Sequence, residues 1–206
     1  MRLKGVSKMQ TVEQKKSPYT KLPNKRLGQK PVSKQFIDRG AVDFHQACDY
    51  VWRLPYGRTQ GSELSSVLIQ GRGTCSSKHG LLKILADELV LDVDLVLGIY
   101  QMCEANTPGV SPAFHDTEYD SVPEAHCYLR YESTRVDLTR YELEGQPISH
   151  FLLEKTIVPE DLSTKADFHQ LYLQSRFGKD ESLKIWVIRE RCISMLSGVQ
   201  SHATNL

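Results

Sequence analysis

The chain has 206 residues, of which 40% are hydrophobic and 25% charged, a composition typical of one globular domain with some extension. No apolar run approaches the roughly 20 residues that span a bilayer, and the first residues lack the apolar core of a secretory signal. We therefore expect neither a membrane span nor export. The overall charge is +1, but it is unevenly distributed along the chain.

The basic residues concentrate at the N-terminal end. Residues 1–34 hold ten Lys and Arg against one acid, a net charge of +9, which leaves −8 for the rest of the chain. This segment has little apolar periodicity, so we predict a basic extended or disordered arm followed by one domain over residues 35–206. The arm could contact an acidic partner or its own acidic domain. Nucleic acid is not an expected partner, because the arm lacks the interspersed aromatic residues of single-strand binders.

Several helices are predicted after the arm. Apolar spacing indicates a helix over residues 42–54, ended by Pro55, and a short helix from Ser62 or Ser65 that stops before the glycines at 71 and 73. The clearest helix follows, with Thr74 as its N-cap and a buried leucine stripe. Gly80 inside this helix indicates a closely packed neighbour.

The second half of the chain mixes strands and helices. Strands are predicted at 91–100, 126–131 and 134–140, a long irregular loop at 102–124, and helices at 148–154, 164–177 and 180–195. The two middle strands meet at the dipeptide Glu132-Ser133 and predict a hairpin.

Cys75 is the strongest candidate for a reactive residue. The five cysteines stand singly without a CxxC pair, which predicts free thiols, a reducing compartment and hence a cytoplasmic location. Cys48, Cys103 and Cys192 are expected to be small buried hydrophobes. Cys75, in contrast, opens the clearest helix just after Gly71-Arg72-Gly73. Helix N-terminal amides favour a thiolate at this position, and they can also hold the oxyanion that forms when the sulfur attacks a carbonyl.

His126 and Asp137 are the predicted partners of that thiol. A two-residue loop pairs residues whose numbers sum to 265, which places His126 and Asp137 diagonally on one face of the hairpin. Asp137 would then hold one ring nitrogen of His126 and leave the other for Cys75. Cys127, the next residue, should point to the opposite face and pack in the core.

Three segments carry a resemblance to a known family. GRGTCSSKHGLL, PEAHCYL and RVDLTRY resemble the pattern of the transglutaminase-like superfamily, which includes bacterial putative cysteine proteases and peptide:N-glycanases. The resemblance covers residues 64–141. It implies an α+β fold with a papain-like core, in which the nucleophile helix packs on an antiparallel sheet, and the helical C-terminal third lies outside it. The chain departs from the pattern at Cys127, where many members have Trp, and at His79, where a small residue is common.

The resemblance implies a thiol-dependent amide hydrolase or acyltransferase with a Cys75-His126-Asp137 triad, acting on a peptide or protein amide through an acyl-enzyme and without a cofactor. The amide of Cys75 would supply half of the oxyanion hole, and Gln70, Trp52 and Tyr56 are candidates for the second donor. Glu104, Asn106, His115 and Tyr119, in the long loop, are candidate substrate contacts.

Two other function classes stay open from the sequence. The same fold could serve as a non-catalytic peptide- or protein-binding module. Cys75, His79, His126 and Asp137 could instead bind zinc, although no compact ligand pair supports a metal site. His79 lies four residues from Cys75 on the same helical face, where it would be either a partner of the site or a satisfied structural histidine.

Overall fold

The protein is an α+β domain built on a four-stranded antiparallel sheet. The computed structural model describes residues 17–61, 63–141 and 145–199. The strand order is β3-β2-β1-β4, with β1 at Asp94–Cys103, β2 at Ser121–Tyr131, β3 at Thr134–Val136 and β4 at Leu153–Ile157. The helices are α1 (Pro31–Ile37), α2 (Phe44–Arg53), α3 (Ser66–Gln70), α4 (Cys75–Glu88), α5 (Lys165–Phe177) and α6 (Lys179–Val199). Short 3-10 turns lie at Pro18–Lys21, Ser111–Phe114 and Pro159–Thr164.

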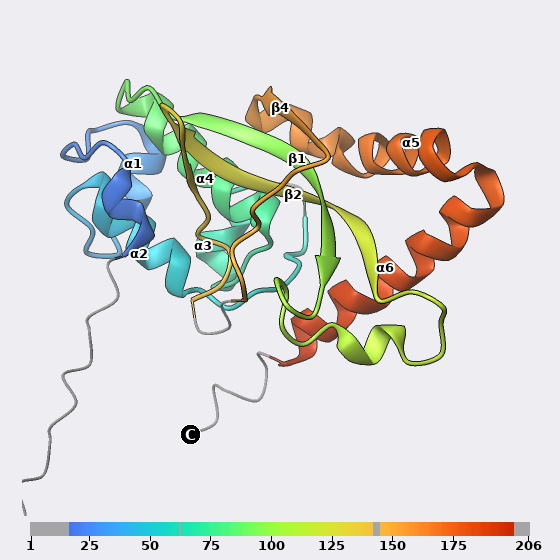
Figure 1. The fold of residues 1–206 in the computed structure, drawn as a ribbon. Coiled ribbons are helices and arrows are strands. Elements are labelled where there is room, and N and C mark those ends of the chain that lie inside the picture. Colours follow the sequence, from blue (N-terminus) through green and yellow to red (C-terminus); the bar gives the residue numbers. More distant parts are fainter. Residues whose placement is uncertain (1–16, 62, 142–144, 200–206) are drawn as a thin grey trace, which may run out of the picture.

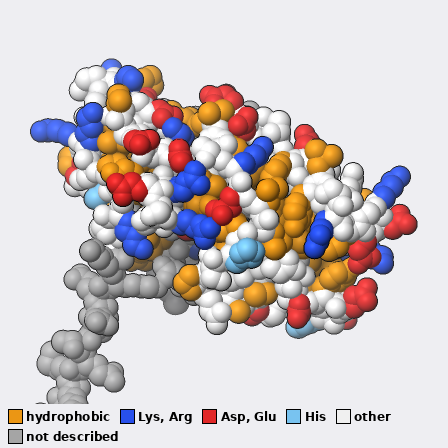
Figure 2. Space-filling model, turned by 45° about the horizontal axis from the view of Figure 1, so that its top comes forward, with side chains coloured by type: hydrophobic (Ala, Val, Ile, Leu, Met, Phe, Trp, Pro, Cys, Tyr) orange, Lys and Arg blue, Asp and Glu red, His pale blue; other side chains and the backbone are white. Residues whose placement is uncertain are grey.

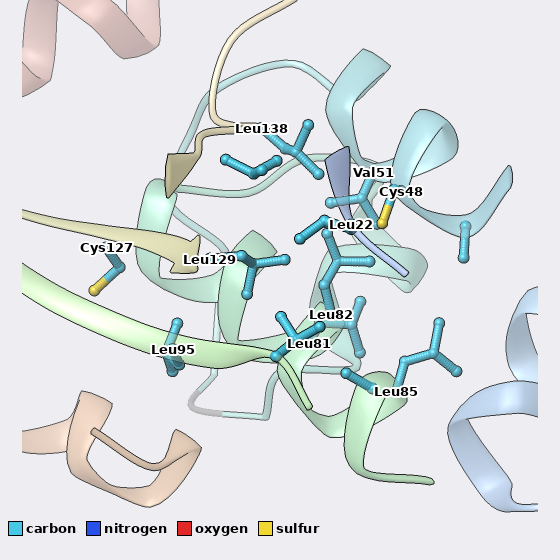
Figure 3. Packing of buried hydrophobic residues seen from close by; sticks show 14 of the residues in the cluster. Leu22, Cys48, Val51, Leu81, Leu82, Leu85, Leu95, Cys127, Leu129 and Leu138 are labelled. Carbon is cyan, nitrogen blue, oxygen red and sulfur yellow. The ribbon is translucent and has the colours of Figure 1, made fainter. Parts of the chain in front are cut away.

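The helices cover the sheet from two sides (Figure 1). Side chains alternate along β1, so that Leu95, Leu97 and Ile99 join a core cluster with α1, α2 and α4. Their neighbours Val96, Tyr100 and Met102 join a second cluster with α6. Figure 3 shows part of the first cluster, where Leu129 of β2 lies with the leucines of α4 and with Leu138.

Helix α4 forms where the sequence predicts it. The Thr74 side chain accepts a hydrogen bond from the backbone N of Ser77, and the Ser77 hydroxyl accepts one from the backbone N of Thr74, which together make a capping box. Close packing at Gly80 is confirmed, because a Cβ there would lie 2.5 Å from Leu162 and 3.0 Å from Leu64. The start of α4 is therefore fixed both by its cap and by its contacts.

Part of the predicted arm belongs to the folded domain. Leu22 and Leu27 are buried in the first core cluster, and α1 begins at Pro31, before the predicted domain boundary at residue 35. The carboxylate of Glu88, at the end of α4, accepts hydrogen bonds from the backbone N atoms of Val32 (2.8 Å) and Ser33 (2.7 Å). A distant acid thus caps α1, a contact that local periodicity does not reveal. The prediction for residues 1–16 lies outside the described residues.

Two predictions in the second half are wrong. The segment 148–154 is not helical, because its end enters β4, which pairs with β1 from Leu95↔Ile157 to Ile99↔Leu153 and satisfies the backbone of an otherwise open sheet edge. The loop predicted at 102–124 is shorter, since β1 runs to Cys103 and β2 begins at Ser121, and it contains the turn Ser111–Phe114. The C-terminal third is accordingly a strand followed by two helices.

The surface mixes charged and apolar side chains. On the face in Figure 2, Lys and Arg are interspersed with Asp and Glu, and hydrophobic side chains show between them. None of the helices in the described part of the chain combines the length and the apolar character that crossing a bilayer requires.

Candidate active site

The hairpin of β2 and β3 has the predicted register. Its pairs are Leu129↔Val136, Arg130↔Arg135 and Tyr131↔Thr134, each summing to 265, and a two-residue turn at 132–133 joins the strands. Beyond Val136 the chain leaves the ladder, and Asp137 bends toward the face that carries His126. The His126 Nε2 and the Asp137 Oδ2 are 2.7 Å apart. The diagonal contact expected from the sequence is present.

Asp137 is held on both carboxylate oxygens. Its Oδ1 accepts hydrogen bonds from the Thr139 backbone N (2.9 Å) and hydroxyl (2.5 Å), which leaves Oδ2 for His126. Burial alone would raise the pKa of Asp137, but the charge and hydrogen bond of His126 hold that pKa well below its usual range. Burial likewise disfavours a charged imidazole, yet Asp137 and then Cys75 raise the pKa of His126 to about 10. His126 is therefore an imidazolium at neutral pH.

His79 is a satisfied structural histidine that supports this arrangement. Its Nδ1 lies 2.8 Å from the Cys75 carbonyl oxygen, and its Nε2 accepts a hydrogen bond from the Leu138 backbone N at 2.8 Å. These partners fix the neutral tautomer with a proton on Nδ1. Burial lowers the pKa of His79, which agrees with a neutral ring. The residue joins the start of α4 to the segment that carries Asp137.

Cys75 lies at the edge of β2 rather than over one face. Helix α4 packs on the face that carries Cys127 and Leu129, whereas His126 points to the opposite face with Tyr128. Helix α4 therefore covers the sheet face opposite the one that carries His126. The thiol of Cys75 nevertheless interacts with both His126 and Cys127, because β3 ends early and leaves this stretch of β2 unpaired on that side.

Two residues that the sequence did not assign to the site surround the sulfur. Cys127 is buried in the core as predicted, but its side chain also hydrogen-bonds to Cys75. The Lys165 Nζ, from the first residue of α5, lies 3.4 Å from the Cys75 Sγ and 3.0 Å from the Ser76 Oγ. No sequence pattern connects Lys165 to a residue 90 positions earlier. Its contact arises because the 3-10 turn Pro159–Thr164 packs against α4 and the start of α5 packs against β2.

The surroundings of Cys75 favour a thiolate. The hydrogen bond from Cys127 is the main cause that holds the pKa of Cys75 well below its usual range; burial opposes it, and the positive charges of Lys165 and His126 add to it. The pKa of Cys127 is correspondingly raised, first by its bond to Cys75 and then by burial. Cys75 is thus the thiolate of the pair and Cys127 the thiol.

A cavity of about 450 Å³ opens beside these groups. Cys75, His126 and Asp137 all line it. Its walls are largely apolar and aromatic, with Tyr100, Tyr128 and Phe151 from the sheet side and Ile193 and Leu196 from α6. A concave, apolar cavity with a few convergent polar groups has the size and character of a small-molecule or side-chain site.

The three candidate oxyanion donors differ in position. Gln70 does not line the cavity and exchanges two hydrogen bonds with the backbone of Gln60 (2.9 and 2.8 Å). Trp52 lines the cavity, but its Nε1 donates to the Arg140 carbonyl at 3.0 Å. Tyr56 is buried at the cavity wall, where burial first and the charge of Cys75 second raise its pKa. Tyr56 and Trp52 thus line the cavity, whereas Gln70 does not.

Of the four candidate substrate contacts, only Asn106 lines the cavity. Glu104 instead binds loop amides, accepting from Gly109 N at 2.9 Å and Ser111 N at 2.7 Å. Tyr119 donates a hydrogen bond to Glu181 of α6, and His115 is exposed on the far part of the loop. Loop composition indicated a functional segment but could not show which side chains turn inward.

The described residues contain no group of three or more His, Cys, Asp and Glu side chains placed to hold a metal ion. His79 explains part of this result, since both of its ring nitrogens are engaged by backbone groups. The zinc alternative therefore loses one of its four ligands. The five cysteines are free thiols.

Removing the ammonium of Lys165 should weaken the thiolate. In Lys165→Met we expect the pH midpoint of Cys75 alkylation by iodoacetamide to move upward by roughly one to three pH units, because an opposite charge in contact is lost. Lys165→Arg keeps a cation and should retain most of the low midpoint. Lys179→Met, at an exposed position, serves as the control. An unchanged midpoint in Lys165→Met would show that this cation does not stabilise the sulfur.

The geometry brings a thiolate, an imidazolium and a carboxylate together at one end of an apolar cavity. Such a set can attack an acyl carbon, protonate a leaving group and keep the imidazole oriented. No family model, curated protein or solved structure matches the chain.

Proposed function

We propose that this protein is a thiol-dependent amide hydrolase or acyltransferase with a papain-like, transglutaminase-like arrangement, in which Cys75, His126 and Asp137 act through an acyl-enzyme. The observation that supports it most is the 2.7 Å bond from His126 to Asp137 beside a helix-terminal thiolate that lines the same cavity. A peptide or protein amide is the proposed substrate. Free cysteines suit a reducing compartment, which supports a cytoplasmic location.

Acylation begins with the sulfur already ionised. The Cys75 thiolate attacks the amide carbonyl carbon, and the backbone N–H groups of the first turn of α4, with Tyr56 as the proposed second donor, stabilise the oxyanion. His126 donates a proton to the amide nitrogen as the C–N bond breaks. The amine leaves, and the acyl group stays on Cys75 as a thioester.

Deacylation uses the same groups in reverse. The neutral His126 accepts a proton from water, or from an incoming amine, as its oxygen or nitrogen attacks the thioester. The C–S bond breaks and the Cys75 thiolate is restored beside the imidazolium. Asp137 acts as a positioning residue, because its carboxylate holds Nε2 and leaves Nδ1 for the sulfur. Water is the default acceptor, and the product is then a free acid.

The test is to trap the acyl-enzyme. We expect 4-nitrophenyl acetate to add one acetyl group to Cys75, detected by intact mass and located by peptide mapping, and we expect none in Cys75→Ala. Cys103→Ala is the matched control, since Cys103 is a partly exposed thiol outside the cavity. Labelling of Cys75 no faster than of Cys103 would contradict the proposal and favour a non-catalytic binding module.

A further inference from the structure

Arg140 lines the cavity, and no carboxylate of the described residues contacts its guanidinium. Its Nη2 donates to the Pro108 carbonyl at 3.0 Å, while its Nε is buried and makes no hydrogen bond. Within residues 17–61, 63–141 and 145–199, no Asp or Glu oxygen forms a salt bridge with its guanidinium. The charges of Glu104 and Asp137 raise the pKa of Arg140 without a contact to its guanidinium.

Three other charged groups that line the cavity are paired. Glu124 is bound by Arg189 at 2.5 Å, Asp137 by His126 at 2.7 Å, and Arg135 by Glu154 at 2.9 Å. Lys21 also lines the opening and adds a second cation. Within the described part of the chain, Arg140 and Lys21 are therefore cations that line the cavity with no carboxylate in contact.

An arginine in this position carries an electrostatic cost. Burial lowers the pKa of Arg140, as expected of a cation that is removed from water and that no carboxylate of the described residues contacts. A guanidinium presents a planar set of donors that matches a carboxylate in two parallel hydrogen bonds. A bound carboxylate would supply the counter-charge to the part of the guanidinium that lines the cavity.

We infer that the amide substrate carries a carboxylate that binds Arg140, joined by an apolar segment to the amide that reaches Cys75. The inference rests on the proposed function for the identity of the scissile bond. Phe151, Ile148 and Tyr100 line the cavity and would contact the apolar segment. The carboxylate belongs either to the acyl part or to the departing amine, and both alternatives share the same chemistry.

Two pairs of matched anilides show whether the carboxylate belongs to the acyl part or to the departing amine. The acyl pair is valeric acid 4-nitroanilide and glutaric acid mono-4-nitroanilide; the amine pair is valeric acid 4-nitroanilide and valeric acid 3-carboxy-4-nitroanilide. We expect one carboxylate-bearing member to have a kcat/KM roughly 10- to 100-fold above its neutral partner, the range of a charge-assisted hydrogen bond. In Arg140→Gln the ratio should fall to near one, and Arg140→Lys should keep part of it.

Arg135→Gln is the matched control. This guanidinium lines the same cavity but is paired with Glu154, so the ratio should persist. Thermal melting of Arg140→Gln checks that loss of the Pro108 contact leaves the domain folded. Equal kcat/KM values within both pairs, or a ratio that survives Arg140→Gln, would overturn the inference.

A binding measurement keeps the inference separate from catalysis. Glutarate monoamide should protect Cys75 from iodoacetamide at lower concentration than valeramide does, and Arg140→Gln should abolish the difference. If glutarate monoamide protects better in the wild-type protein only and no anilide is turned over, the proposed function is contradicted and the carboxylate site at Arg140 is supported. If both amides protect equally and the anilides within each pair are turned over equally, the carboxylate site at Arg140 is contradicted and the thiol chemistry of Cys75 is still supported.

Discussion

Replacing His126 by glutamine is expected to slow acylation of Cys75 by an amide by about 10²- to 10⁴-fold, the usual contribution of a general acid or base. The same change should affect 4-nitrophenyl acetate much less. The thiolate is also stabilised by Cys127 and Lys165, so it persists without the imidazolium. Nitrophenolate can leave as an anion, whereas an amine must be protonated before it leaves. The ratio of the two rates therefore isolates the acid role of His126.

Stopped-flow or discontinuous assays of both acyl donors measure that ratio. His115→Gln, an exposed histidine outside the cavity, should leave both rates unchanged. Equal losses for the ester and the amide would mean that His126 serves to ionise Cys75 and is not the acid. Asp137→Asn should reduce the amide rate less than His126→Gln, because it misorients the imidazole without removing it.

The pH profile of the wild-type amide reaction follows from the same groups. A raised pKa means that His126 keeps its proton until the pH approaches about 10, so the acid form is present below that pH and is lost as the pH rises through it. The Cys75 thiolate is lost on the acid side as the sulfur is protonated. A broad plateau across neutral pH is the expected result, and the ester reaction should lack the alkaline decline.

Local rules were sufficient to predict that His126 and Asp137 lie together and that Cys75 begins a helix. The length of the turn at 132–133 and the alternation of side chains along two strands fixed the register, and the capping preference of Thr74 fixed where α4 begins. These features depend on neighbours in the sequence. They predict Cys75 at a helix terminus and His126 and Asp137 on one side of the hairpin.

Contacts between distant segments were not predictable in the same way. Lys165 reaches Cys75 because the second half of the chain packs back on α4, and Glu88 caps α1 from more than fifty residues away. The strand β4 forms because β1 has an open edge, and this tertiary pairing overrides a local helical pattern. Three of the four substrate-contact candidates lie outside the cavity, because loop composition carries no information on side-chain direction.

The buried pair of Glu124 and Arg189 should dominate the stability of the cavity wall. The two side chains join β2 to α6, with Arg189 Nε 2.5 Å from one Glu124 oxygen and Nη2 2.8 Å from the other. Only 4% of Glu124 and 9% of Arg189 is exposed. In Arg189→Met a buried carboxylate loses its counter-ion, so we expect the free energy of unfolding to fall by roughly 3–5 kcal/mol at pH 8.

Chemical denaturation of Arg189→Met at several pH values tests this. Burial opposes ionisation of Glu124, but Arg189 keeps its pKa below the usual range, so in the wild-type protein the pair stabilises above the unfolded pKa and fails as the pH falls. Without Arg189 the folded pKa should rise above the unfolded one. The remaining stability is then greatest at acid pH and decreases as the pH rises through the new folded pKa.

The double variant Glu124→Gln/Arg189→Met separates charge from packing. It removes the buried charge and should recover much of the loss at pH 8 while abolishing the inverted pH dependence. Arg58→Gln, which breaks an exposed pair with Glu190, should cost under about 1 kcal/mol. His169 lies 3.9 Å from Glu124, and in the single variant Arg189→Met it can take up a proton at acid pH, which adds to the stability of that variant at acid pH. If Arg189→Met loses the same free energy at pH 5 and pH 8, its effect comes from packing, and the carboxylate behind the cavity does not depend on this arginine for its charge.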